Sequence, residues 1–176
     1  IINARNVNHA LSDGLWYLAT AGIREESRNG AVIVAPGPVV TVYQKPQERV
    51  LFNAERNANP FFHLMEALWM LAGRNDLAWP VKFNSRFAAY SDDGQSVNGA
   101  YGARWRRWFE YDQITTLITL LQEDPETRRA VLTMWSPVHD LGSNSKDIPC
   151  NTQAYFDLRG GVLNMTVCCR SNDIIW

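Results

Sequence analysis

Cys150 is a candidate nucleophile, because it stands at the entrance of a predicted strand in the segment "DIPCNTQAYF" (147–156). A cysteine taken alone is more often a small buried hydrophobic residue than a nucleophile. Thiols react as thiolates, so a catalytic role for Cys150 requires positive charge nearby. The sequence offers four arginines for that purpose: Arg28, Arg128, Arg129 and Arg170.

Glu66 is a second candidate, because it interrupts the apolar segment "FFHLMEALWMLAG" (61–73). Carboxylates are rarely buried without a partner. One interpretation places Glu66 on the solvated face of a helix. The other gives it a carboxyl group with a raised pKa that can transfer protons. The pattern alone leaves both interpretations open.

Other polar segments carry weaker signals. The segment "ESRNGA" (26–31) could bind an anion through Arg28 and nearby backbone amides. The pair Arg128–Arg129 is equally well explained as a solvated turn. His63 and His139 lack the spacing to cysteines or carboxylates that metal sites have, so the sequence predicts no metal site. It also contains no Walker loop and no dinucleotide-binding fingerprint.

The composition is that of a globular protein. With 176 residues, 46% of them hydrophobic and 20% charged, the chain can build one core, and we expect a single domain over residues 1–176. The net charge of −1 gives no global positive field, so we expect no direct binding to nucleic acid or to an anionic membrane. Only three of the 17 basic residues are lysines, and this excess of arginine favours a small anionic ligand.

The cysteine content bears on the cellular compartment. The chain has three cysteines, two of them adjacent, and this odd number argues against a disulfide framework. A reducing compartment is therefore expected, the cytoplasm or, for a viral protein, the host cytoplasm. No apolar run approaches the length of a membrane span, and no signal peptide is recognisable. Both ends of the sequence look cut rather than finished.

Helices and neighbouring strands are predicted to alternate without a βαβ rhythm, which favours an α+β domain. Hydrophobic spacing predicts helices over residues 6–20, 59–73 and 112–124, the second of them buried and the third capped by Asp112. Strand patterns predict a hairpin within 25–44 broken at Gly37–Pro38, a strand over 128–135, and a hairpin over 152–169 turning on Gly160–Gly161. Residues 84–100 are expected to be irregular.

Taken together, separate motifs resemble the thymidylate synthase family, including its pyrimidine-nucleotide hydroxymethylases. They occur in the family's order and nearly at its spacing, over a stretch from about Arg28 to Trp176. The resemblance implies a thymidylate synthase-like mixed β-sheet packed with helices, with the C-terminal third missing. The motifs are "MEALWMLAGRND", "NGAYGARWRRW", "DPETRRAVLTMW", "DIPCN" and "CCRSND".

The resemblance implies a catalytic role for three residues. Cys150 matches the nucleophile that adds to carbon 6 of the pyrimidine of a nucleoside monophosphate, which makes carbon 5 nucleophilic. Carbon 5 then takes a one-carbon unit from methylene tetrahydrofolate. Glu66 matches the glutamate that manages protons through ordered water, and Tyr101 matches a tyrosine near the proton that leaves carbon 5.

The resemblance also implies how nucleotide and folate are bound. Arg28 and Arg170, with Ser171 beside them, match residues that bind the phosphate within one chain. Arg128 and Arg129 match the arginine pair that reaches the phosphate from the other subunit, so a homodimer with shared active sites is implied. Asp173 matches the aspartate that holds the pterin ring of the folate.

Three departures from the family pattern concern base and folate binding. Asn151 follows the nucleophile where synthases usually carry histidine, and Phe87 and Tyr90 stand where they usually carry two tryptophans. The first tryptophan packs against the folate and the exocyclic methylene intermediate, so its absence argues against methyl formation. We therefore favour a hydroxymethylase acting on dUMP or dCMP. A thymidylate synthase and a non-catalytic nucleotide-binding relative remain the alternatives.

Overall fold

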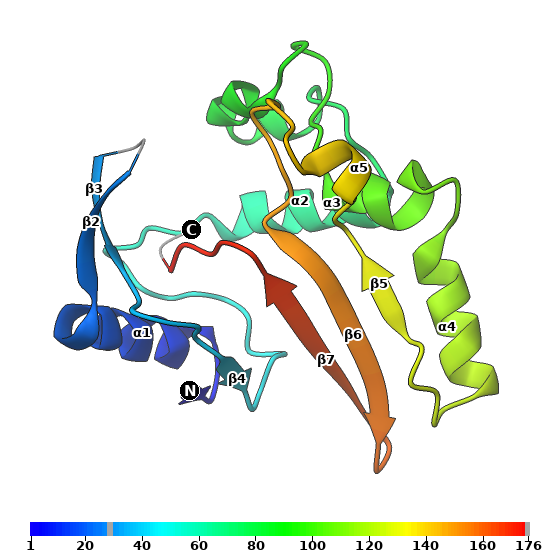
Figure 1. Ribbon diagram of the computed structural model, residues 1–176, viewed down its shortest axis with the longest axis horizontal. Coiled ribbons are helices and arrows are strands. Elements are labelled where there is room, and N and C mark those ends of the chain that lie inside the picture. The colour runs from blue at the N-terminus through cyan, green and yellow to red at the C-terminus, as the bar shows by residue number, and fades with distance from the viewer. Residues whose placement is uncertain (28–29, 175–176) are drawn as a thin grey trace. The chain divides into compact units, whose positions relative to one another are not determined.

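The chain divides into two units in a computed structural model, which describes residues 1–27 and 30–174 (Figure 1). One unit comprises Ile1–Pro60 together with the segment that begins at Asp173, and the other comprises Phe61–Asn172. Most of the candidate site residues lie in the second unit. The single domain over residues 1–176 stays a prediction.

The described residues of the first unit form one helix and four short strands: β1 (Ile2–Ala4), α1 (Val7–Ala21), β2 (Ile23–Ser27), β3 (Gly30–Val34) and β4 (Thr41–Tyr43). The helix predicted over residues 6–20 is confirmed, and the side chain of Asn6 caps it by accepting from the amides of Asn8 and His9. The prediction of a hairpin broken at Gly37–Pro38 is wrong about which strands pair. β3 pairs antiparallel with β2, whereas β4 pairs in parallel with β1.

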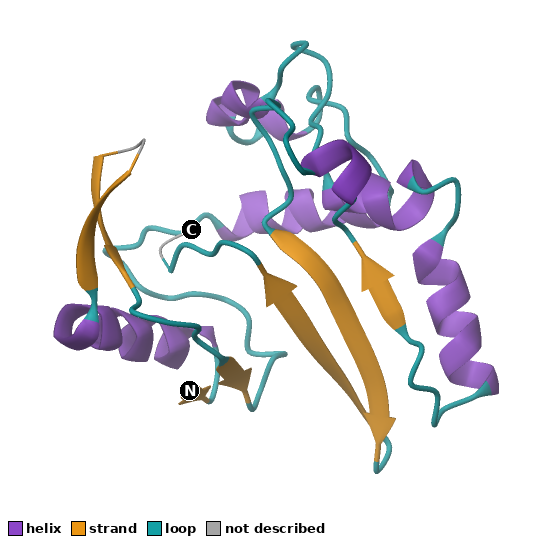
Figure 2. Ribbon diagram, in the orientation of Figure 1, coloured by secondary structure: helices purple, strands orange, loops and turns teal. Residues whose placement is uncertain are grey.

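The second unit is an α+β arrangement around an antiparallel sheet of order β5-β6-β7, drawn in orange in Figure 2. Its strands are β5 (Val131–Thr133), β6 (Asn151–Arg159) and β7 (Val162–Cys169). Its helices are α2 (Pro60–Leu71), the 3₁₀ helices η1 (Pro80–Lys82) and η2 (Ser85–Tyr90), α3 (Tyr101–Ala103), the π-helix η3 (Arg104–Trp108), α4 (Gln113–Glu123) and α5 (Pro137–Asp140).

Several predicted elements of this unit are confirmed. Asp112 caps α4 by accepting from the amide of Thr115 at 3.0 Å. The hairpin between β6 and β7 turns on Gly160 and Gly161, whose φ angles of 56° and 76° require glycine. The segment expected to be irregular contains the short helix η2.

The prediction that α2 is buried is wrong for most of its length. Only Trp69 of this helix is buried. The elements of the unit cover one side of α2, and its other side exposes large apolar side chains, namely Phe61, Leu64, Leu68 and Leu71.

One face of the sheet is packed against helices. Leu132, Met134 and Ala154 are buried there. The partly buried hydrophobic residues that cover them come from α3, η3, α4 and β6: Tyr101, Trp105, Ile114, Leu117 and Phe156. Tyr101 therefore belongs to the packing layer over β6, close to the segment that carries Cys150.

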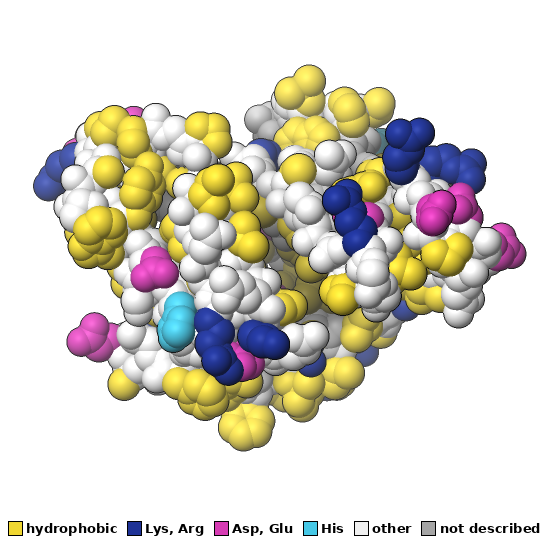
Figure 3. Space-filling view, turned by 90° about the horizontal axis from the view of Figure 1, so that it is seen from below, with side chains coloured by type: hydrophobic (Ala, Val, Ile, Leu, Met, Phe, Trp, Pro, Cys, Tyr) yellow, Lys and Arg dark blue, Asp and Glu magenta, His cyan; other side chains and the backbone are white. Residues whose placement is uncertain are grey.

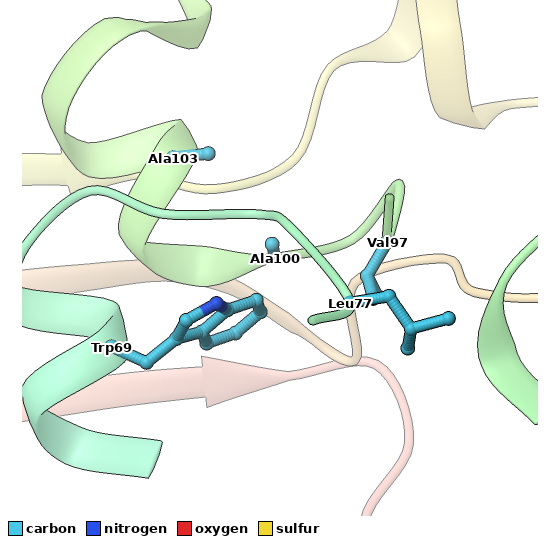
Figure 4. Packing of buried hydrophobic residues seen from close by; sticks show 5 residues of the cluster. All are labelled: Trp69, Leu77, Val97, Ala100 and Ala103. Carbon is cyan, nitrogen blue, oxygen red and sulfur yellow. The ribbon is translucent and has the colours of Figure 1, made fainter. Parts of the chain in front are cut away.

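A second cluster joins α2 to α3 (Figure 4). It is built from Trp69, Leu77, Val97, Ala100 and Ala103. The backbones of the two helices come so close that a Cβ atom at Gly102 would lie 2.1 Å from the carbonyl oxygen of Met70. Glycine at this position thus lets α2 approach the segment that contains Tyr101.

Large apolar side chains are exposed beyond α2. β7 is an edge strand, and all eight of its residues are exposed. Hydrophobic side chains also show over much of the face drawn in Figure 3, with basic and acidic side chains grouped between them. None of the helices in the described residues is long and apolar enough to cross a membrane.

Candidate active site

Cys150 lies directly before β6, and its backbone is held by Tyr101. The hydroxyl oxygen of Tyr101 accepts hydrogen bonds from the amides of Cys150 and Asn151, both at 3.1 Å. These two donors occupy the acceptor sites of the oxygen, so the phenolic proton is free to be donated to another group. Burial raises the pKa of Tyr101 above its ordinary value, which already leaves the phenol protonated at neutral pH.

Arg170 provides positive charge beside the same loop. Its backbone amide donates to the carbonyl of Cys150 at 2.9 Å. Its guanidinium donates to the carbonyls of Ile148 and Pro149, both at 2.9 Å, and lies over the ring of Trp135. Nη1 has no hydrogen-bond partner among the described residues, so it can bind an anion. The guanidinium of Arg170 is thus bound to the backbone of the loop that carries Cys150.

Glu66 lies on a face of α2 that aromatic rings cover. Phe62, Glu66 and Trp69 share this face by their helical spacing. The ring of Phe87 packs against Phe62 and Trp69, with centroid distances of 6.1 and 5.9 Å. Tyr90 packs on Phe87 in turn, at 5.9 Å. Phe87 thus lies over the helix face that carries Glu66.

Burial raises the pKa of the Glu66 carboxyl, and this side chain forms no ion pair within the described part of the chain. Of the two interpretations of the sequence, the structure therefore favours the carboxyl with a raised pKa. Such a group holds its proton more readily than an exposed glutamate does and can exchange it with water or substrate.

Replacing Glu66 by glutamine is expected to raise stability at neutral pH. The pKa of Glu66 in the folded state lies above the unfolded value of about 4.3. Below about pH 4.3 the carboxyl is protonated in both states and does not oppose folding. As pH rises through the folded-state pKa, the buried group must ionise, and the stability of the wild-type protein falls. The stability gain of Glu66→Gln should therefore shrink as pH falls toward about 4, while turnover is lost because an amide cannot take up the proton. Denaturant unfolding at several pH values measures this.

The matched control is Glu123→Gln, an exposed glutamate at the end of α4, which should leave stability unchanged at each pH. A Glu66→Gln stability gain that grows toward low pH would contradict the assignment.

Arg128 and Arg129 lie in the same unit but away from Cys150. Both are exposed, and neither forms an ion pair within the described residues. Arg128 lines a shallow pocket with Asp157 and Arg159, near the end of β6, whereas Cys150 precedes its start. At about 3.3 Å per strand residue, this separation is roughly 20 Å or more. The two arginines therefore do not contribute to the Cys150 site of their own chain.

The remaining predicted site residues are less closely tied to Cys150. The side-chain oxygen of Asn151 accepts from the thiol of Cys169 at 2.9 Å. Ser171 is exposed next to Arg170. Asp173 belongs to the first unit, and Arg28 lies outside the described residues. The roles of these residues in binding stay predictions.

Sequence reasoning missed Asp147, which precedes Cys150 by three residues. Its carboxylate accepts from the amide of Gly99 at 2.8 Å, and burial raises its pKa. The only signal was an acidic residue inside the "DIPC" motif, and in a polar loop such a residue suggests a solvated side chain. Within the described residues, no group of three or more His, Cys, Asp or Glu side chains could hold a metal ion.

Comparison with known families identifies the fold and the family. Residues 19–176 match the family model described as "Thymidylate synthase". The chain belongs to the thymidylate synthase family. The resemblance seen in its motifs is thereby confirmed.

Relatives within the thymidylate synthase family carry a more specific name. A "Deoxyuridylate hydroxymethyltransferase" from Pseudomonas phage M6 is 54% identical over 177 residues, covering 100% of this chain and 50% of that protein. One of the same name from Bacillus phage SP01 is 39% identical over 150 residues, covering 79% of this chain and 39% of that protein. The chain thus spans about half the length of the curated relatives it matches, or less.

Solved structures confirm the predicted α+β thymidylate synthase fold. The thymidylate synthase from T4 phage superposes with a TM-score of 0.54 at 22% identity, covering 64% of this chain and 44% of that one. Thermostable thymidylate synthase A from Bacillus subtilis gives a TM-score of 0.54 at 23% identity, covering 64% and 43%. At this level of identity the likeness concerns the fold alone.

Proposed function

We propose that the protein hydroxymethylates carbon 5 of dUMP, with methylene tetrahydrofolate as one-carbon donor and water as the final nucleophile. The observation that carries the proposal is the 54% identity, over the whole of this chain, to a phage protein named for deoxyuridylate hydroxymethyl transfer. That name favours uracil over cytosine, a choice that the sequence left open. Because these relatives come from phages, we place the reaction in the host cytoplasm.

The residues around Cys150 support the first half of this reaction. The thiolate of Cys150 forms a bond to carbon 6 of the pyrimidine, and the displaced electron pair makes carbon 5 nucleophilic. Arg170 supplies positive charge beside the loop and a free Nη1 group for the phosphate. Tyr101 can donate its phenolic proton to a hydrogen-bonded water near carbon 5.

Methylene tetrahydrofolate, a co-substrate, supplies the one-carbon unit. Carbon 5 bonds to this carbon, the carbon–nitrogen bond to the folate breaks to release tetrahydrofolate, and loss of the carbon 5 proton leaves an electrophilic exocyclic methylene. Water then adds its oxygen to the methylene and loses a proton, and the Cys150 thiolate leaves carbon 6. Glu66 is the residue of this unit best suited to manage those protons, because burial raises its pKa and Phe87 lies over its helix face.

We propose a homodimer in which Arg128 and Arg129 bind the phosphate in the partner's site. Both are exposed and form no ion pair within the described chain, so their charges are available to a ligand. They also lie near the end of β6 that is remote from Cys150 of the same chain. These observations favour a role for the two arginines in the active site of the other subunit over a role in the site of their own chain.

The family model leaves thymidylate synthase as the second candidate, and the fate of the folate separates the two. Hydroxymethyl transfer leaves tetrahydrofolate unoxidised, whereas methyl formation consumes a hydride and yields dihydrofolate. We expect the native protein to release hydroxymethylated nucleotide together with tetrahydrofolate. Chromatography of both products measures this, and dihydrofolate in amounts equal to nucleotide product would establish a thymidylate synthase instead.

In the same assay Phe87→Trp is expected to shift the products toward methylated nucleotide. The larger ring would fill space beside the aromatic face of α2 and displace water. Because Phe87 packs among Phe62, Trp69 and Tyr90, its variant must first be shown to be folded by circular dichroism. A folded variant that still gives only hydroxymethylated product would remove Phe87 as the determinant of the product.

A further inference from the structure

The loop before Cys150 is tied to the segment before Tyr101 by a residue that the reaction does not use. Asp147 accepts from the amide of Gly99 through Oδ2 at 2.8 Å. Its backbone carbonyl accepts from the side-chain amide of Asn98 at 3.0 Å. Two successive residues of one segment therefore hold a single residue of the other, through its side chain and its backbone.

Asn98, which binds the backbone of Asp147, is held in place by further hydrogen bonds. The carbonyl oxygen of Asn98 accepts from Nε and Nη2 of Arg104, at 3.3 and 3.1 Å. The Arg104 side chain is fully buried and paired with Asp140. The segment that holds Asp147 is thus anchored in the interior.

Each residue from Ile148 to Asn151 has a backbone group that forms a hydrogen bond with either Arg170 or Tyr101. Arg170 binds the carbonyls of Ile148 and Pro149, and Tyr101 binds the amides of Cys150 and Asn151. Arg170 and Tyr101 are also the groups proposed to meet the substrate. Asp147 is different, because it is not among the groups proposed to meet the substrate, and its hydrogen bonds are with Asn98, Gly99 and Ser145.

Gly99 is fitted closely to this carboxylate. A Cβ atom at position 99 would lie 2.7 Å from Oδ2 of Asp147 and 3.0 Å from its Cγ. The clash is with the end of a side chain, so an added methyl group would push the carboxylate away and break its hydrogen bond. Alanine at position 99 should therefore reproduce the loss of Asp147 without touching the loop itself.

We propose that Asp147 is a positioning residue: its bond to Gly99 fixes the place of Cys150 relative to Tyr101. The consequence for catalysis rests on the proposed function, in which Cys150 attacks the pyrimidine. A nucleophile displaced by about 1 Å can lose on the order of 100-fold in rate. Removal of the Asp147 carboxylate slows bond formation by Cys150 and leaves nucleotide affinity little changed.

The test follows formation of the covalent adduct between Cys150 and 5-fluoro-dUMP, in the native protein with methylene tetrahydrofolate. We expect Asp147→Ala to lower the maximal rate of adduct formation by about 100-fold, with the nucleotide dissociation constant little changed. Asp147→Asn keeps an oxygen that accepts from Gly99, so it should react at least about ten times faster than the alanine variant. Asp124→Ala, at an exposed position after α4, is the matched control.

A double-mutant cycle ties the effect to Gly99. Gly99→Ala alone should slow adduct formation much as Asp147→Ala does. In the Asp147→Ala background it should add no further loss, because the carboxylate that the new methyl group would displace is gone. Multiplicative losses would mean that the two positions act independently, and would overturn the proposal.

Hydrogen exchange at the amides of Cys150 and Asn151 reports positioning without any chemistry. Both amides donate to Tyr101, so they should exchange faster in Asp147→Ala and at the native rate in Asp147→Asn. Unchanged exchange in Asp147→Ala would overturn the proposal. If the native protein forms no adduct at all, the proposed function fails, and this measurement still decides the role of Asp147.

Discussion

Replacing Arg104 by methionine is expected to lower the free energy of unfolding by about 3–5 kcal/mol. The side chains of Arg104 and Asp140 are both fully buried, and they form a bidentate pair with N–O distances of 2.6 and 2.9 Å. The guanidinium also donates to the carbonyls of Met134 and Asn98 and lies 4.5 Å from the ring centroid of Trp108. Its removal leaves the buried Asp140 carboxylate without its cation.

The size of this effect comes from burial rather than from the geometry of the pair. Arg74 and Asp76 form a bidentate pair with the same distances, 2.6 and 2.9 Å, but their side chains are 44% and 35% exposed. Arg74→Met is therefore the matched control, and it should cost about 1 kcal/mol or less. Denaturant unfolding of both variants in the native protein measures the difference.

A second variant separates the unpaired charge from other causes. Arg104→Met combined with Asp140→Leu removes both charges, and it should recover much of the stability that the single change loses. The carbonyls of Met134 and Asn98 remain without their donor, so recovery is expected to be incomplete. Equal losses in the single and double variants would show that the unpaired Asp140 charge is not the cause of the loss.

Cys150→Ala is expected to abolish covalent adduct formation with 5-fluoro-dUMP and to lower turnover on the order of 10⁴-fold or more. Under the proposed function, the substitution removes the atom that bonds to carbon 6, whereas the arginines proposed to bind the nucleotide remain. Nucleotide binding should persist, and mass spectrometry of the intact protein should show no added mass.

The chain provides matched controls, because its other two thiols are also exposed. The sulfur of Cys168 lies 3.9 Å from the side-chain amide of Gln153, and the thiol of Cys169 donates to Asn151. Cys168→Ala and Cys169→Ala should both form the adduct. An undiminished adduct in Cys150→Ala would move the nucleophile to one of these two residues.

Local patterns predicted the elements that depend on local physics. The cap at Asp112 and the two glycines at 160 and 161 act within a few residues, so the sequence places α4 and the β6–β7 hairpin correctly. The pairing of β1 with β4 joins strands of three residues each, far apart in the chain. Strands this short carry too little periodicity to predict.

Local sequence patterns also fail to predict which individual side chains of the site are buried or paired. Three arginines stand in "RWRRW" (104–108), and nothing in their type distinguishes them. Arg104 alone is fully buried, because it begins η3 on the side that faces Asp140. In the same way, "DIPC" reveals the cysteine through its family motif, whereas the partner of Asp147 lies 48 residues away. Such contacts depend on how distant segments fold together.

The exposed edge of β7 has a consequence for the behaviour of the polypeptide during synthesis. Its outer backbone groups face no other strand within the described residues, and Val162, Leu163, Met165 and Val167 are exposed. The strand also lacks proline and any charged side chain, the two devices that commonly keep such edges from pairing. A nascent chain that has reached β7 therefore carries a segment able to recruit identical strands into intermolecular β-sheet, and aggregation competes with folding until that edge is covered.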